Sequence, residues 1–147
     1  MNTSRGLSLA AAVLTAASLT AGCRAPTACA APVPPVLLGS WTYSATQTNP
    51  SATLSGILQI TSQCGQELGG ALSGSIVDVN GSRPFTGTIS GVVVDTTVDF
   101  DGFLSVDAAA RRHVGIVRND SLNGYWFSVA GSGSPSGSFT SAWTSTP

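Results

Sequence analysis

The stretch from Leu72 to Gly91, LSGSIVDVNGSRPFTGTISG, carries the most informative pattern in the chain. On both sides of its centre, apolar residues and glycines alternate with serine and threonine, a period of two that is typical of strands with one buried face. Between the two halves stands Asn80-Gly81, a pair that is favoured in tight hairpin turns because both residue types tolerate positive φ. The stretch therefore predicts an antiparallel β-hairpin.

The same alternation runs along the chain from Leu37 to its C-terminal part. The residues expected on the inner face are Leu37, Gly39, Trp41, Tyr43, Leu54, Gly56, Leu58, Ile60, Leu72, Gly74, Ile76, Phe85, Gly87, Ile89, Gly91, Val93, Val98, Phe100, Gly102, Leu104, Leu122, Gly124, Trp126, Gly137, Phe139 and Trp143. Segments rich in Gly, Pro, Asn and Ser separate the runs and predict turns. With 114–118 counted as a strand, the pattern predicts about eight strands, and only 105–112 is expected to form a helical turn or two.

A short motif recurs in these predicted strands: an apolar residue, a small polar residue, glycine, one further residue and an apolar residue. It reads LSGSI at 72–76, FTGTI at 85–89, LNGYW at 122–126 and, with proline in first place, PSGSF at 135–139. Each glycine falls on the apolar face, where a missing side chain leaves room for a strand that coils round a narrow core. A β-solenoid would need a more regular repeat length. The sequence therefore predicts an all-β fold, a single antiparallel up-and-down β-barrel of about eight strands over residues 37–147, which also removes exposed strand edges.

The first predicted strand carries GSW at 39–41, which resembles the G-x-W signature on the first strand of lipocalins. Avidin-like barrels also open with such a Gly-x-Trp, so the chain resembles a small lipocalin- or avidin-like (calycin-type) β-barrel over about 37–146. Two features depart from these families. Lipocalins usually place an Arg near the last strand to cover the Trp, and no Arg follows Arg118; avidins present an Asp from late strands, and no Asp follows Asp120. Neither family's ligand-binding residues are therefore carried over.

Residues 1–22 have the composition of a signal peptide. Arg5 supplies a short positive region, and 6–19 form an uncharged apolar run. This run is shorter than the roughly 20 residues that a membrane-spanning helix needs. The sequence therefore predicts export, with 1–22 removed.

Two cleavage sites compete. LTAGC at 19–23 resembles the lipobox of bacterial lipoproteins, although Thr20 stands where that box most often has Leu. This resemblance implies a lipid anchor on Cys23 and, because Arg24 rather than Asp follows it, the outer membrane if the cell has one. The rival is ACA at 28–30, a site for ordinary signal peptidase that lies far beyond the apolar run and would yield a secreted protein. We expect the lipobox to be used, which makes the protein a membrane-anchored lipoprotein of the cell envelope.

With this cleavage the mature chain begins with 23–36, the lipidated cysteine and a linker rich in Pro and Ala. If Cys23 is acylated, Cys29 and Cys64 remain, an even number in an oxidising compartment. A disulfide between them would close a loop of about 35 residues and stabilise the fold by about 4 kcal/mol. The alternative is that Cys29 stays in a flexible tether and neither thiol is paired.

Charge is scarce in this chain. Charged residues are 9% of the total, and no lysine occurs. From Cys23 onward five Arg stand against seven Asp and Glu, a net charge of about −2. Because no basic patch can form, the sequence predicts no positively charged surface that could bind nucleic acid, and we set that class of partner aside.

Residues for catalysis or metal binding are few. His113 is the only histidine, so a two-histidine metal site cannot form within one chain. No G-x-S-x-G nucleophile elbow occurs, and the segment with Asp99 and Asp101 lacks two carboxylates that a calcium loop requires. We expect His113, beside Arg111 and Arg112, at a solvated strand start, and both acids on a solvated strand face. The sequence therefore predicts no catalytic residues, no metal site, no cofactor and no enzymatic activity.

Large aromatic residues are the remaining candidates for a site. Those expected to point inward, and proposed as ligand-binding residues, are Trp41, Tyr43, Trp126, Phe139 and Trp143. They either fill the core or line a pocket. Phe103, Tyr125 and Phe127 fall on the opposite face and are available to a protein partner that the sequence does not identify.

Two functions follow. The first, which we expect, is a non-catalytic envelope lipoprotein whose barrel binds a small apolar or amphipathic ligand. The alternative is a barrel with a filled core that acts through its surface, as an inhibitor, an adhesion module or a structural module. An interior cavity ringed by Trp41, Trp126 and Trp143 would favour the first function.

Overall fold

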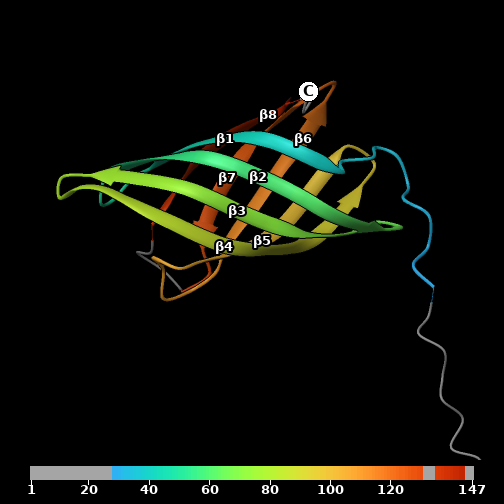
Figure 1. Ribbon diagram of the computed structural model, residues 1–147. Coiled ribbons are helices and arrows are strands. Elements are labelled where there is room, and N and C mark those ends of the chain that lie inside the picture. Colours follow the sequence, from blue (N-terminus) through green and yellow to red (C-terminus); the bar gives the residue numbers. More distant parts are fainter. Residues whose placement is uncertain (1–27, 131–134, 145–147) are drawn as a thin grey trace, which may run out of the picture.

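The alternating sequence folds into eight antiparallel strands that close on themselves (Figure 1). The structure is a computed structural model that describes residues 28–130 and 135–144, without the side chains of Trp143 and Thr144. The predicted signal peptide at 1–22 and the predicted lipidation site Cys23 lie outside the described residues. Within the described part of the chain, no helix is long and apolar enough to cross a membrane.

The strands follow one another along the chain in the order in which they pair. Their bounds are β1 Gly39–Gln47, β2 Ala52–Cys64, β3 Glu67–Asp78, β4 Gly81–Val94, β5 Thr97–Leu104, β6 Arg111–Arg118, β7 Ser121–Ser128 and β8 Ser136–Thr144. Each strand pairs antiparallel with the next, and β8 returns to pair with β1, for example at Thr42↔Ala142. This confirms the predicted all-β, up-and-down barrel.

The barrel has two ends, which we name by what lies on them. At the strap end are the turns β2–β3, β4–β5 and β6–β7, together with residues 28–37, which we call the strap. At the distal end are the connections β1–β2, β3–β4, β5–β6 and β7–β8. In Figure 1 the strap, in blue, lies beside the β2–β3 turn and far from the β3–β4 turn.

The hairpin predicted from 72–91 is formed by β3 and β4, with its turn one residue earlier than expected. Val79 and Asn80 connect the strands, and Gly81 begins β4 with a φ of 107°. Asp78 caps this turn: its carboxylate accepts hydrogen bonds from the Asn80 amide at 2.7 Å and from the Arg83 guanidinium at 2.6 Å. These two contacts, the amide first, hold the pKa of Asp78 below its ordinary value.

Glycines on the inner face allow neighbouring strands to coil tightly, as the repeated motif predicts. Gly56 of β2 lies opposite Gly74 of β3. A Cβ on Gly56 would collide with the backbone carbonyl of Ser73, and a Cβ on Gly74 would collide with that of Ser55. The missing side chains are therefore what permits this close approach of the two strands.

The core contains the apolar side chains that the period of two predicts inside, Leu37 of the strap among them, except Trp143, whose side chain is not described. It also contains four residues that were not predicted: Ala45, Ala52, Leu68 and Val117. The helical turn expected over 105–112 is wrong. Residues 105–110 form a non-helical connection, and Arg111 already belongs to β6, where it pairs with Gly102 and Ser128. Pairing with two neighbouring strands satisfies the backbone of Arg111 and overrides the helix propensity of the preceding alanines.

Candidate functional site

Five aromatic rings from five strands meet inside the barrel. They are Tyr43 of β1, Phe100 of β5, His113 of β6, Trp126 of β7 and Phe139 of β8. The imidazole of His113 is central: its centroid lies 4.5 Å from that of Phe100 in a stacked pair and 5.1 Å from that of Phe139 in an edge contact. Three predicted ligand-binding residues, Tyr43, Trp126 and Phe139, thus belong to one buried cluster.

The expectation that His113 sits at a solvated strand start is wrong, because its side chain is 0% exposed. Its Nδ1 lies 3.0 Å from the Arg111 carbonyl oxygen, which can only accept, so Nδ1 carries the proton. Its Nε2 then accepts a hydrogen bond from the hydroxyl of Tyr43 at 2.9 Å. The ring is therefore a neutral, fully hydrogen-bonded part of the core.

Burial shifts the pKa values of both members of this pair toward their uncharged forms. It lowers the pKa of His113 from 6.5 to about 4, although the hydrogen bond to the Arg111 carbonyl acts in the opposite direction. Burial likewise raises the pKa of Tyr43 well above its ordinary value of 10.0. Neither group is thus poised to exchange protons near neutral pH, which suits a structural role.

Mild acid is expected to destabilise the barrel through His113. In the unfolded chain the imidazole binds a proton below pH 6.5, whereas in the folded chain it stays neutral down to about pH 4. The contribution of His113 to the free energy of unfolding is therefore fully present above pH 6.5. It is lost as the pH falls toward 4, and the loss is roughly 2 kcal/mol at pH 5. Urea unfolding at pH 8 and pH 5 measures this loss. In a His113→Gln variant, which cannot titrate, the difference between the two pH values should be much smaller; an equal difference in both proteins would contradict the assignment.

Arg111 is also buried, contrary to the expected solvated strand start. Its guanidinium carbon lies 4.2 Å from the centroid of the Trp126 ring, a cation–π contact, and the guanidinium binds both carboxylate oxygens of Asp107. Lipocalins cover the tryptophan of the first strand with an arginine, whereas here an arginine covers the tryptophan of β7 at the distal end. In this bidentate ion pair the negative charge of Asp107 compensates the positive charge of Arg111.

Trp41 lies apart from the aromatic cluster, toward the strap end. Its Nε1–H donates to the Leu37 carbonyl oxygen at 2.9 Å, and the side chain is 3% exposed. The Nε1–H of Trp126 donates instead to the Thr46 carbonyl oxygen at 3.1 Å. The backbone of Trp143 pairs with that of Trp41, but its side chain lies outside the described residues. The two described tryptophans therefore occupy opposite parts of the barrel and ring no common cavity.

Hollows occur at both ends of the barrel. The distal hollow, about 240 Å³, is lined by Trp126, Arg111, Asp107 and the connection β5–β6. The strap hollow, about 260 Å³, lies between 35–38, Trp41 and the β6–β7 turn. Each is large enough for a small molecule but not for a drug-sized ligand.

The acids of β5 lie on the outer face, as the alternation predicts. Asp99 forms a bidentate ion pair with Arg112, at 2.9 and 2.6 Å, and raises the pKa of that arginine. Asp101 lies directly opposite Arg112 in the strand pairing. Among residues 28–130 and 135–144, no three His, Cys, Asp or Glu side chains are grouped closely enough to hold a metal ion.

The outer face of β5 and β7 carries the exposed aromatic residues that the sequence predicts. Phe103 and Tyr125 are each 56% exposed, and Tyr125 stacks on Phe127 with ring centroids 6.4 Å apart. A third hollow, of about 270 Å³, adjoins Tyr125 on the outside of β6 and β7. Aromatic surface of this kind is typical of protein interfaces.

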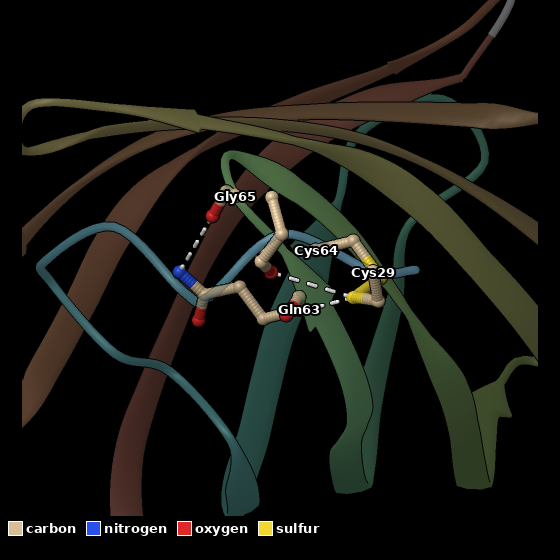
Figure 2. The surroundings of a disulfide bond; sticks show 5 residues. Cys29, Gln63, Cys64 and Gly65 are labelled. Atoms are coloured by element: carbon tan, nitrogen blue, oxygen red, sulfur yellow. Dashed lines mark hydrogen bonds between the residues drawn. A yellow bond between two sulfur atoms is a disulfide. The ribbon is translucent and has the colours of Figure 1, made fainter. Parts of the chain in front are cut away.

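Cys29 and Cys64 form a disulfide that ties the strap to the end of β2 (Figure 2). Gln63, beside this bond, is 4% exposed and holds the strap with its side-chain amide. Its Nε2 donates to the carbonyl oxygens of Val33 and Pro35, at 3.0 and 3.1 Å, and its Oε1 accepts from the Leu37 amide at 2.9 Å. Part of the predicted linker is therefore fastened to the barrel.

The roles of His113, Arg111 and Gln63 were not expected from the sequence. The sequence RRHVGIV held a signal for His113 and Arg111. Extending the predicted strand at 114–118 backward by three residues puts positions 111, 113, 115 and 117 on one face, and this places both side chains inside. Gln63 carries no such signal, because it follows the bulge that shifts the pairing of β2 between Ile60 and Ser62.

The fold and the site define the chain as a closed, eight-stranded up-and-down β-barrel compatible with the lipocalin-like class. No protein-family model matches the sequence, and no curated protein is significantly similar to it.

Proposed function

We propose that this protein is an exported, lipid-anchored module of the cell envelope that acts without catalysis through the outer surface of a filled barrel, as an inhibitor, an adhesion module or a structural module. The observation that carries this proposal is the packed aromatic interior. The rings of His113 and Phe139 contact each other, and each also contacts the rings of Tyr43 and Phe100. An apolar ligand would have to displace them.

The polar atoms of these inward side chains support the same proposal. The Tyr43 hydroxyl binds His113, and the indole N–H groups of Trp41 and Trp126 bind backbone carbonyls. A ligand-binding interior usually keeps a few polar groups ready for its ligand. Here these three groups are used for internal hydrogen bonds, which favours a structural interior and leaves the outer face for function; the exceptions include Nη1 of Arg111 and Oγ of Ser141, which are buried without a partner.

The disulfide supports export and the lipobox. Disulfides persist in oxidising compartments outside the cytoplasm. Cleavage at ACA, after Ala30, would separate Cys29 from the barrel, whereas cleavage before Cys23 retains the bond between Cys29 and Cys64. The retained bond therefore favours the lipid-anchored chain.

A small amphipathic ligand in the distal hollow is the second candidate. Its specific support is the apolar ring of Trp126 beside the Arg111–Asp107 ion pair within one hollow. Since the ion pair is neutral as a whole, this hollow suits an uncharged ligand better than an anion.

Uptake of an apolar fluorescent probe separates the two functions. With a filled interior, titration of the mature protein with a naphthalene sulfonate dye or a neutral styryl dye is expected to give no saturable signal. Ala109→Trp, which would fill the distal hollow, is the matched control. Saturable uptake that this variant abolishes would contradict the surface function and favour the ligand site.

A further inference from the structure

We infer that the strap end of the barrel faces the lipid bilayer and that the distal end points away from it, because the disulfide reduces the membrane tether to a few residues. This inference rests on the lipid anchor at Cys23 in the proposed function. The partner surface is the headgroup region of a bilayer.

The strap is fastened to the barrel at several points besides the disulfide. The Gly65 amide donates to the Ala30 carbonyl oxygen at 3.1 Å, and the Val33 amide donates to the Gly65 carbonyl oxygen at 3.0 Å. The side chain of Gln63 adds its bonds to Val33, Pro35 and Leu37. Because Leu37 is buried in the core, the strap is an extension of the barrel rather than a free linker.

The reach of the tether follows from chain length. A free linker from Cys23 to Leu37 could span roughly 50 Å, at about 3.5 Å per residue. With Cys29 bonded to Cys64, six residue steps separate the anchor at Cys23 from the point where the chain is fixed to the barrel, and six steps span at most roughly 20 Å. This is less than the length of β4, which has 14 residues and extends for roughly 45 Å. The strap end is therefore held within roughly 20 Å of the bilayer in every orientation, whereas the distal end comes equally near only if the barrel lies on its side.

The surface of the strap is suited to this position. Val33 and Val36 of the strap and Leu38, which follows it, are 46%, 57% and 40% exposed, although each is a large apolar residue. The strand ends and turns at the same end carry three acids, Glu67, Asp95 and Asp120, and one base, Arg118. An anionic bilayer would repel these carboxylates, so contact through the apolar strap is favoured on a neutral phosphatidylcholine surface.

Energy transfer from the two ends of β4 to the bilayer tests the inference. A donor dye is placed through an azide-bearing residue at Thr96, in the strap-end turn, or at Val79, in the distal turn, so that the cysteines stay intact. The lipidated protein is reconstituted in phosphatidylcholine vesicles with an acceptor dye on the headgroups. Transfer from Thr96 is expected to exceed transfer from Val79 at least twofold.

A variant with ten Gly and Ser residues inserted between Arg24 and Ala25 is the matched control, because it keeps the lipobox, the strap and the disulfide. Its longer, flexible tether should bring the ratio close to one. Equal transfer from both positions in the parent protein would overturn the inference, and so would a ratio that survives the insertion.

The intact mass of the mature protein tests the lipid anchor separately. A mature protein without acyl chains would overturn the proposed lipoprotein as well, whereas an acylated protein with equal transfer would overturn only the orientation.

Discussion

Trp126→Ala is expected to lower the free energy of unfolding by about 3–5 kcal/mol, the usual cost of removing a buried tryptophan. The side chain is 1% exposed, its Nε1–H binds the Thr46 carbonyl oxygen, and Arg111 packs on its ring. The truncation would also leave the Arg111–Asp107 ion pair without its apolar support. Since a small domain is stable by only about 5–15 kcal/mol, the melting temperature should fall sharply. Urea unfolding at pH 8, with circular dichroism, measures the loss.

Two further variants serve as controls for Trp126→Ala. Trp41→Ala is expected to cost a similar amount, because Trp41 is 3% exposed and also binds a backbone carbonyl. Trp126→Phe, which keeps a ring beneath Arg111 and loses only the hydrogen bond and part of the contact area, should cost clearly less. If Trp126→Ala costs far less than Trp41→Ala while wild-type protein binds an apolar probe, Trp126 lines a ligand site and the filled-core proposal is wrong.

Reduction of the Cys29–Cys64 disulfide is expected to lower the free energy of unfolding by about 4 kcal/mol. The bond joins residues 35 positions apart and so restricts the unfolded chain, whose loop-closure entropy sets this magnitude. The barrel itself should remain folded, because its strands begin at Gly39 and pair without the strap. Unfolding with and without a phosphine reductant measures the effect.

A Cys29→Ser/Cys64→Ser double variant controls for side effects of the reductant. Its stability should match that of the reduced parent protein and should not respond to reductant. Thiol labelling of the denatured, unreduced parent protein should find neither of these two cysteines reactive. Two reactive thiols, or a parent protein whose stability is indifferent to reductant, would contradict the bond.

The inward and outward faces of the barrel could be predicted because they depend on local stereochemistry. Successive side chains of a strand point to opposite faces, so the alternation in 72–91 places Leu72, Ile76 and Phe85 inside without knowledge of any partner strand. The glycines on that face then indicate curvature. The same rule failed at 105–112, where a run of alanines suggested a helix and concealed the start of β6.

The candidate site could be predicted only in part. The inward positions of Tyr43, Trp126 and Phe139 follow from the alternation, and the structure adds that these side chains share one cluster with His113. The inward position of His113 follows from the same alternation once β6 is extended back to Arg111, but its hydrogen-bond partner, Tyr43, lies 70 positions away in the sequence. No local pattern specifies such a partner.

The period of two, most of the turns and the glycine-dependent curvature could be read from short segments, and together they predicted a barrel; its closure depends on the pairing of β8 with β1, which are remote in the chain. The partners of the buried polar groups depend on long-range packing: Nε2 of His113 accepts from Tyr43, Nε and Nη2 of Arg111 bind Asp107 while its buried Nη1 has no partner, and Gln63 and Cys64 hold the strap. A buried donor or acceptor is satisfied only where the fold brings a partner within hydrogen-bonding distance. Which residue that is depends on the register of strands and segments that are remote in the chain and meet only when the barrel closes.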